Sequence, residues 1–424
     1  MNFPQRMVLL LFAASLVAGL MTGQQLYYRL TYLWGLLFGL SWLMSRLSLR
    51  NLEVARRARS LRSQVGQVYE ERFELRNNGR LPRLWIEVRD EAPIPSSAGS
   101  HVLTLVGGRE GRSYMSRTRL IERGVFPLGP TVLASGDLFG LFPTARSFEA
   151  KETLLVYPML FPVSHFPSPA GLLPGGEALR RRTAQITSNA AGVREYAPGD
   201  PLNRIHWLST ARRSRLMVKE FELDPLAEVW IFVDGFRVAH ASLPRPVDDI
   251  DPRDMWRKRA PLKLPPSTIE YAVSVAGSLS RYYLQLGRAV GLVTAGAALD
   301  ILPADRGGRQ LGKILERLAM LQADGPLPLP GQVEAQARHL PRGSTVILIT
   351  PSTSESTVKA ADLLLRRGLR PVGVLLDPST FGGYFSSDPI FEQLQFLGIP
   401  VVKINNGDDI GTALSEASRA QKLT

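Results

Sequence analysis

The chain has 424 residues and a net charge of +13 at pH 7, with 45% hydrophobic and 21% charged residues. This length predicts two or three domains, and the composition excludes a disordered or collagen-like chain. The sequence contains no cysteine, which excludes disulfides, thiolate metal sites and cysteine nucleophiles. The surplus of positive charge favours an anionic surface, either acidic lipid or nucleic acid.

Two apolar runs at the N-terminus predict a membrane hairpin over residues 1–50. Residues 7–23 carry no charge and are long enough to cross the hydrocarbon core of a bilayer. Residues 26–44 form a second run with a single charge, Arg29, and with Trp42 near its end, where aromatic rings favour the lipid–water interface. A signal peptide is the alternative for the first run, but no small-residue cleavage site follows it.

The basic residues around this hairpin predict its orientation. Arg6 precedes the first run, the connecting turn has no basic residue before Arg29, and arginines cluster after the second run. By the positive-inside rule, both ends of the hairpin and the soluble domains lie in the cytoplasm. We expect the cluster to contact lipid phosphates. It consists of Arg46, Arg50, Arg56, Arg57, Arg59 and Arg62. No helix-turn-helix, RNP or zinc-finger signature supports a nucleic-acid partner, and we expect none.

Residues 51–165 show a strand-like pattern. Apolar and polar residues roughly alternate in segments such as 67–75 and 84–89, and glycine- and asparagine-rich turn signals separate them. Five or more short strands at this spacing predict a β-sandwich. Its expected role is a spacer between the membrane and the next domain.

The spacing of apolar residues along the chain changes in residues 225–424. Continuous apolar runs replace the alternation, which is typical of strands buried on both faces of a parallel sheet. These runs are 229–233, 289–293, 346–349 and 372–376. Residues 299–302 are expected to form an antiparallel edge strand. Helical segments lie between the runs, so this part predicts an α/β domain of Rossmann-like winding, and the whole chain is an α+β multidomain protein.

The linking segment, residues 166–224, holds the most unusual pattern, in which charges of both signs surround aromatic residues and a Pro-Gly-Asp turn. It closely resembles the signature of the bacterial domain of unknown function 58 family. The positions that carry this resemblance are our candidate interaction site. They are Arg194, Glu195, Tyr196, Gly199, Asp200, Arg204, His206, Trp207, Arg212, Lys219 and Glu220.

The resemblance implies more than the residues show by themselves. It implies a multi-pass protein of the bacterial inner membrane whose C-terminal domain is similar to a von Willebrand factor A domain. It also implies two partners, a MoxR-type AAA+ ATPase and a transglutaminase-like membrane protein. The expected function is that of a non-enzymatic scaffold or adaptor in ATPase-driven assembly or in maintenance of the cell envelope.

Domains of the von Willebrand type often hold Mg²⁺ through an Asp-x-Ser-x-Ser loop after the first strand. Here Asp234 is followed by Phe236 and Val238 at the two serine positions, and a later strand ends at Thr350 without a carboxylate. A hard cation needs several oxygen ligands. We therefore expect a degenerate site, no metal and no cofactor, with Asp234 capping its own loop.

Three interpretations of the signature segment stay open at this stage. It is a clasp in which Arg204 and Arg212 pair with Glu195 or other acidic residues, or a docking surface with Arg, Tyr and Trp as hot spots. The third is a catalytic centre, perhaps of a hydrolase, in which Asp200 orients His206 as a base, although no nucleophile is evident. We expect Arg204 to be structural and Arg212 to be an exposed contact.

Overall fold

The computed structural model describes residues 2–95, 97, 99–167, 190–196, 205–221, 228–244 and 262–420, and for 190–194, 219–221 and 417–420 it describes the backbone. The chain is a mixed α/β protein with an apolar N-terminal helix and several sheets. It divides into two compact units. Met1–Met159, Arg245–Leu264 and Leu315–Met320 form the first, and Leu160–Pro244, Pro265–Ile314 and Leu321–Thr424 form the second.

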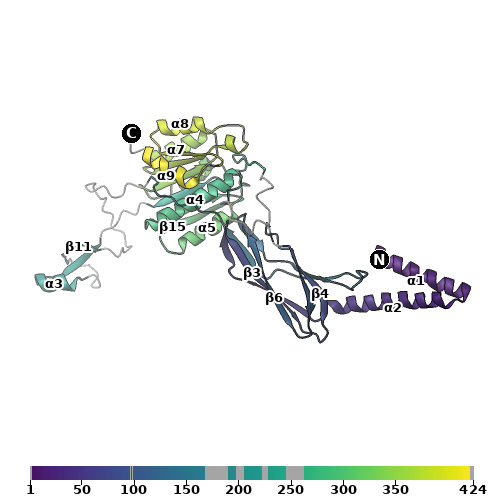
Figure 1. Cartoon of the computed structure of the whole chain (residues 1–424). Coiled ribbons are helices and arrows are strands. Elements are labelled where there is room, and N and C mark those ends of the chain that lie inside the picture. Colours follow the sequence, from purple (N-terminus) through teal and green to yellow (C-terminus); the bar gives the residue numbers. More distant parts are fainter. Residues whose placement is uncertain are drawn as a thin grey trace. The chain divides into compact units, whose positions relative to one another are not determined.

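The first unit begins with two helices, α1 (Phe3–Thr22) and α2 (Gln25–Ser48), which lie side by side (Figure 1). Gly23 adopts a left-handed conformation with φ 67°, which glycine tolerates and which ends α1. Thr31 Oγ1 donates a hydrogen bond to Ser15 Oγ at 3.1 Å and joins the two helices. Among the described residues, α1 is the helix that is long and apolar enough to cross a membrane. Helix α2 contains more polar and charged side chains, and its mean hydropathy is too low to meet the same criterion.

The β-rich part of this unit contains three sheets. One antiparallel sheet has the order β1 (Leu52–Ala58), β3 (Val68–Asn77), β6 (Gly111–Arg119). A second has the order β5 (Ser100–Val106), β4 (Arg83–Asp90), β8 (Thr131–Ser135), β9 (Thr144–Phe148). A third, smaller sheet has the order β2 (Arg62–Gln64), β10 (Thr153–Tyr157), β7 (Gly124–Pro127).

The first two sheets share one apolar core. Every second residue of β3 is buried, as the alternation in the sequence predicts. Phe73 and Leu75 of β3 pack in one cluster with Ile86 and Val88 of β4 and with Leu133 of β8. These side chains are at most 2% exposed.

Several arginines that we expected at the lipid surface form ion pairs within the β-rich part instead. The Arg56 guanidinium donates to Glu71 at 2.6 Å and to Asp90 at 2.8 Å, and these three side chains are 10%, 1% and 7% exposed. Arg57 pairs with Glu74, and Arg59 with Glu70; both arginines are exposed and both glutamates are half-buried. The expectation for Arg56 is therefore wrong, because its side chain is buried between Glu71 of β3, the antiparallel neighbour of β1, and Asp90 at the end of β4.

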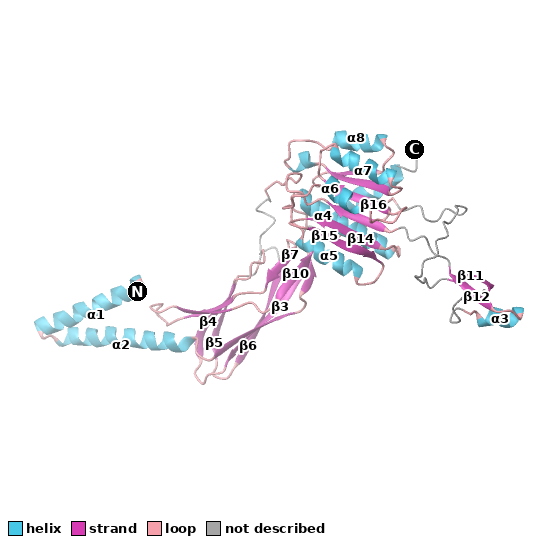
Figure 2. Cartoon of the chain, turned by 180° about the vertical axis from the view of Figure 1, so that it is seen from behind, coloured by secondary structure: helices cyan, strands magenta, loops and turns pink. Residues whose placement is uncertain are grey.

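The second unit is built on a six-stranded sheet, seen with its covering helices in Figure 2. Its order is β15 (Leu299–Asp305), β14 (Val290–Ala295), β13 (Val229–Val233), β16 (Thr345–Thr350), β17 (Arg370–Leu376), β18 (Val401–Ile404). All neighbours pair in parallel except β14 with β15, so the expected antiparallel edge strand is confirmed. The helices that follow in the chain are α4 (Thr268–Gln285), α5 (Gln310–Met320), of which Leu315–Met320 is counted in the first unit, α6 (Leu329–Gln336), α7 (Ser356–Arg366), the 3₁₀ turn η4 (Pro378–Phe381), α8 (Asp388–Phe396) and α9 (Ile410–Ala420).

The central strands of this sheet are buried along their whole length. Every residue of β13, β14 and β16 is buried, which explains the continuous apolar runs in the sequence. Trp230 and Phe232 of β13 pack in one cluster with Val333 of α6 and Leu364 of α7. Their neighbour Ile231 points to the opposite face, because side chains alternate along a strand.

Candidate functional site

The signature residues that the structure describes form a small unit. Strands β11 (Ala190–Glu195) and β12 (Met217–Phe221) pair antiparallel, and helix α3 (Trp207–Arg213) lies between them in the chain. The Tyr196 amide donates to the Leu216 carbonyl oxygen at 2.8 Å. We call residues 190–196 and 205–221 the signature unit.

This unit has a short apolar interior. Ile205, Met217 and Val218 are 7%, 2% and 2% exposed. The His206 amide donates to the Met217 carbonyl oxygen at 2.8 Å, and the Met217 amide donates to Thr210 Oγ1 at 3.0 Å. The backbone of His206, just before α3, and the Thr210 hydroxyl within it therefore hold this helix against β12, and its apolar side chains add little to the interior.

Helix α3 presents its side chains to solvent. Each of its seven residues is exposed or half-buried, and Trp207 and Leu208 are 69% and 60% exposed. Arg212 and Arg213, in the last turn, are exposed as well. Large apolar side chains exposed beside arginines are typical of a protein-binding surface. The exposure of Arg212 fits a docking surface better than a buried clasp.

The acidic residue at the end of β11 pairs with an arginine that the sequence reasoning missed. Glu195 Oε1 accepts from Arg215 Nη1 at 3.0 Å, whereas Arg212 was an expected partner. The two side chains are 65% and 73% exposed, so solvent screens the pair and its contribution to stability is small. The hairpin register, which sets Glu195 opposite Met217, brings Arg215 close to it.

Gly199, Asp200 and Arg204 lie outside the described residues, and Arg194, Lys219 and Glu220 are described by their backbone in β11 and β12.

His206 acts as the N-cap of α3. Its Nδ1 accepts a hydrogen bond from the Ser209 amide at 3.2 Å and lies 2.8 Å from Ser209 Oγ. A side-chain acceptor at this position satisfies one of the free amides at the start of a helix. The sequence reasoning missed this contact, and the signal that could have found it is the spacing, since Ser209 stands three residues after His206.

The carboxyl end of the sheet holds the two residues of the predicted degenerate metal site. The Asp234 side chain is fully buried, and it accepts hydrogen bonds from Thr350 Oγ1 at 2.6 Å and from the Phe236 amide at 3.0 Å. Burial raises the pKa of Asp234 to about 6, even though both hydrogen bonds lower it. The bond to the Phe236 amide is the loop cap that the sequence predicts.

These residues do not fit a divalent cation. The oxygens of Asp234 are occupied by protein donors, and Phe236 and Val238 supply no ligand oxygen. Within the described ranges, no group of three histidine or acidic side chains is arranged to hold a metal ion.

A second carboxylate lies at the end of the neighbouring strand β17, and the sequence reasoning missed it. Asp377 accepts from Lys403 Nζ at 2.9 Å and from the Ser379 amide at 3.1 Å. Burial acts to raise the pKa of Asp377, but the hydrogen bonds from Lys403 and Ser379 outweigh it and hold the pKa below its usual value. Lys403 also pairs with Asp388 at the start of α8.

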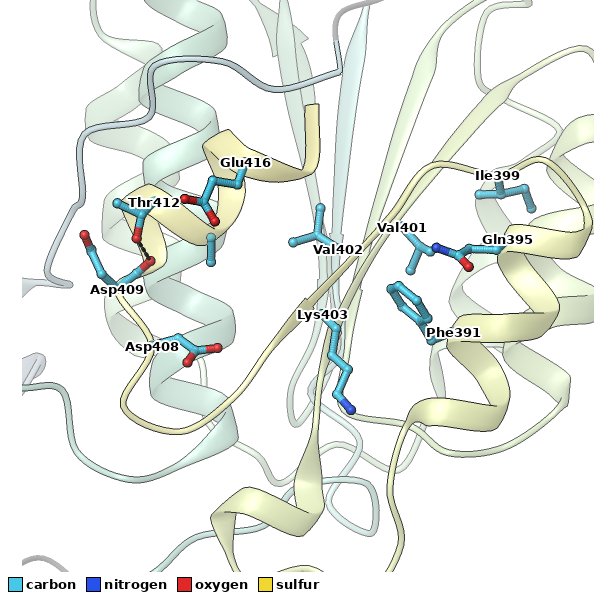
Figure 3. Close-up of a pocket in the computed structure, with 11 residues that line it drawn as sticks. Phe391, Gln395, Ile399, Val401, Val402, Lys403, Asp408, Asp409, Thr412 and Glu416 are labelled. Atoms are coloured by element: carbon cyan, nitrogen blue, oxygen red, sulfur yellow. Dashed lines mark hydrogen bonds between the residues drawn. The ribbon is translucent and has the colours of Figure 1, made fainter. Parts of the chain in front are cut away.

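Lys403 lies at the border of a groove of about 510 Å³ between α8 and α9, with strand β18 along its floor (Figure 3). The α8 side is largely apolar and includes Phe391. Asp408, Asp409 and Glu416 line the other side, where Asp409 accepts from Thr412 at 2.9 Å through its carbonyl oxygen. The ammonium group of Lys403 is already held by two carboxylates, so the groove offers a surface and no evident catalytic group.

Comparison with known proteins agrees with the resemblance seen in the signature segment. A family model described as "Protein of unknown function DUF58" matches residues 192–242. The chain is also similar to "Uncharacterized protein YeaD" of Bacillus subtilis (strain 168), with 25% identity over 244 residues, which cover 57% of this chain and 54% of that protein. The chain thus spans about half the length of the curated relative it matches.

Likeness to solved structures is weak. The CARDB domain of a Pyrococcus furiosus protein shares 12% identity and a TM-score of 0.18, covering 25% of this chain and 91% of that one. The alkylpurine DNA glycosylase AlkC of Pseudomonas fluorescens shares 10% identity and a TM-score of 0.15, covering 32% and 43%. At these scores the likeness supports no conclusion about fold or function.

Proposed function

We propose that the chain is a membrane-anchored, non-enzymatic scaffold whose signature unit docks a protein partner. The observation that carries this proposal is the exposure of α3, with Trp207 and Leu208 in solvent beside Arg212 and Arg213. Tryptophan and arginine dominate the binding energy of protein interfaces. An exposed pair of large apolar side chains costs solubility unless a partner covers it.

The proposed anchor is the helical hairpin, with α1 and α2 both crossing the bacterial inner membrane. The apolar composition of α1 and its side-by-side packing with α2 support a paired insertion. The arginines that follow the hairpin favour a cytoplasmic location for the soluble domains. The β-rich part is then a β-sandwich stalk next to the membrane.

We propose that the α/β part is a von Willebrand factor A-like domain. Its strands, numbered from one to six along the chain, lie in the order 3-2-1-4-5-6, the order of doubly wound nucleotide-binding folds. The third strand in sequence, β15, runs antiparallel to β14. This order, together with the family resemblance of the signature segment, supports the assignment.

The proposed partner is a MoxR-type AAA+ ATPase, acting with a transglutaminase-like membrane protein in assembly or envelope maintenance. The resemblance to the domain of unknown function 58 family supports this choice. The partner surface must offer an apolar pocket for Trp207 and acidic groups for Arg212 and Arg213, because these are the exposed features of α3.

A pull-down of the cognate ATPase by the full chain in detergent tests the proposal. Trp207→Ala and Arg212→Ala should each weaken binding by about 30-fold or more, the size of a hot-spot loss of about 2 kcal/mol. The melting temperature should stay unchanged, because α3 adds little to any core. Phe396→Ala is the matched control, since Phe396 is 92% exposed on α8. Equal loss of binding in the control, or unchanged binding in the α3 variants, would refute the proposal.

The alternative is a hydrolase-type enzyme that uses Asp200 and His206. The 2.8 Å separation of His206 Nδ1 and Ser209 Oγ favours it, because a base in contact with a hydroxyl is the core of a nucleophilic site. The bond from the Ser209 amide to the same nitrogen is explained by helix capping alone. Turnover that is lost in His206→Ala while the fold persists would favour the enzyme.

A further inference from the structure

A pocket of about 570 Å³ lies within the first unit, at the base of the helical hairpin. The start of α1, the end of α2 and the segment 142–146 before and within β9 form its walls. Ser45 Oγ donates to the Phe142 carbonyl oxygen at 2.7 Å, and Gln5 Nε2 donates to the Leu141 carbonyl oxygen at 2.8 Å. The Phe38 and Phe142 rings also meet edge to face at 5.1 Å. These contacts tie both helices to the β-rich part, so the walls are held in place before any ligand binds.

The charged side chains of this pocket are all basic. Arg46 lies in the last turn of α2, Arg50 lies just after this helix, and Arg146 comes from β9. All of the lining residues fall in the described part of the chain, and none of them is acidic. The three arginines are exposed, and none has a carboxylate partner among the described residues. The pocket therefore concentrates positive charge that the protein does not neutralise.

Aromatic rings fix the direction of two of these arginines. The Arg46 guanidinium lies 5.3 Å from the centre of the Trp42 ring, and that of Arg146 lies 4.9 Å from the centre of the Phe148 ring. Stacking of this kind restricts the guanidinium while leaving its N–H groups free to bind an anion. The end of α2 bears a partial negative charge, so on that side the guanidinium groups, and not the helix backbone, would hold the anion.

We propose that this pocket binds the phosphate headgroup of an anionic phospholipid. The inference rests on the proposed membrane anchor, which places the base of the hairpin at the headgroup layer. Phosphate is the group that several converging guanidinium groups recognise best. Apolar wall residues, Leu49 and Phe142, and the exposed ring of Trp42 favour a lipid over a small soluble anion, because they offer contact to glycerol and acyl carbons.

The test uses the full chain exchanged into mixed micelles that contain equal amounts of phosphatidylglycerol and phosphatidylcholine. Mass spectrometry of the intact complex then counts each lipid retained per protein. We expect the wild type to retain phosphatidylglycerol more than tenfold over phosphatidylcholine. The R46Q/R50Q/R146Q variant should lose this preference, because it removes the three guanidinium groups. R146Q alone, at an exposed position, should reduce the preference severalfold. This single variant replaces the triple variant in the test if the triple variant does not fold.

The matched control is R57Q/R59Q/R117Q, which removes the same charge from exposed positions outside the pocket. It should retain the lipid within twofold of the wild type. An equal loss in the control, or no preference in the wild type, would overturn the inference. Inorganic phosphate is a further arm. If it displaces the lipid at concentrations comparable to the headgroup, the pocket is a site for a free anion and the lipid assignment is wrong.

Membrane fractionation separates this inference from the proposed anchor. Wild type and R46Q/R50Q/R146Q should both stay in the membrane fraction, because the apolar surface of the hairpin is unchanged. A wild type found in the soluble fraction would overturn the anchor itself. A wild type that stays in the membrane fraction but shows no lipid preference would overturn the pocket alone.

Discussion

Replacement of Asp234 by asparagine should remove a pH dependence of stability that is built into the α/β sheet. Asn has the shape of Asp, and its Oδ1 can still accept from the Phe236 amide. Its Nδ2 would donate to Thr350 Oγ1, which also accepts from the Ser352 amide at 2.9 Å. The variant therefore keeps both contacts of this side chain and loses the charge, and the contact with Thr350 reverses its direction, because in the wild type the hydroxyl donates to the carboxylate.

The magnitude follows from the raised pKa of Asp234. The pKa is about 6 in the folded chain and 3.8 in the absence of structure, and each unit of difference is worth about 1.4 kcal/mol. Between pH 3.8 and 6 the folded state keeps a proton that the unfolded state has lost, so stability falls as pH rises through this window. Above pH 6 the ionised, buried carboxylate costs about 3 kcal/mol. Below pH 3.8 the cost vanishes.

Urea unfolding of the full chain in a mild non-ionic detergent, followed by circular dichroism at several pH values, measures this effect. The stability of D234N relative to the wild type should rise by up to about 3 kcal/mol between pH 4 and pH 7.5. D377N is the control of opposite sign. The pKa of Asp377 lies below its usual value, so this group contributes stability above pH 3.8 that is lost as pH falls through the lower, folded pKa. A difference between D234N and wild type that does not change with pH would refute the assignment of the shift to Asp234.

Three further predictions address other parts of the chain. Arg56→Ala should lower the free energy of unfolding by about 3–5 kcal/mol, because it leaves buried carboxylates unpaired. Arg57→Ala, at an exposed ion pair, should change it by less than about 0.5 kcal/mol. Equal effects of the two variants in urea unfolding would contradict the burial of the Arg56 pair. A single cysteine that replaces Gln24 should react with a membrane-impermeant thiol reagent in intact spheroplasts, whereas one that replaces Ser97 should react only after lysis. The reverse pattern would be incompatible with a cytoplasmic β-domain. Millimolar Mg²⁺ should not raise the melting temperature of the full chain, and a rise that Asp234→Ala abolishes would show that a cation site survives.

The α/β part was the easier half to predict from sequence. Its strands are buried on both faces, so runs such as 229–233 and 346–349 contain only apolar residues and stand out without any knowledge of their neighbours. The antiparallel edge at Leu299–Asp305 was predictable for a related reason, since it follows the preceding strand too closely for a crossover helix.

The sites made of residues far apart in the chain were not predictable in this way. Arg46, Arg50 and Arg56 look alike in the sequence, yet the register of β1 against β3 places Arg56 beside Glu71 and leaves the other two at the pocket. Arg146 joins that pocket from a strand almost a hundred residues away. The ion pair of Asp377 and Lys403 likewise depends on β17 and β18 being neighbours in the sheet. Local pattern cannot supply such pairings, because they are set by tertiary register.

The distribution of arginines has a consequence for the kind of partner that each surface can take. Arg57 at the end of β1 and Arg59 just after this strand pair with glutamates, whereas Arg212 and Arg213 on α3 are exposed beside Trp207. Salt screens contacts between exposed charges but not the burial of an apolar ring. Partner binding through α3 should therefore weaken only in part as ionic strength rises. The affinity that remains at high salt should depend on the Trp207 ring and should be lost in Trp207→Ala. Binding that salt abolishes completely would point to a purely electrostatic partner, and the docking role of the ring would be wrong.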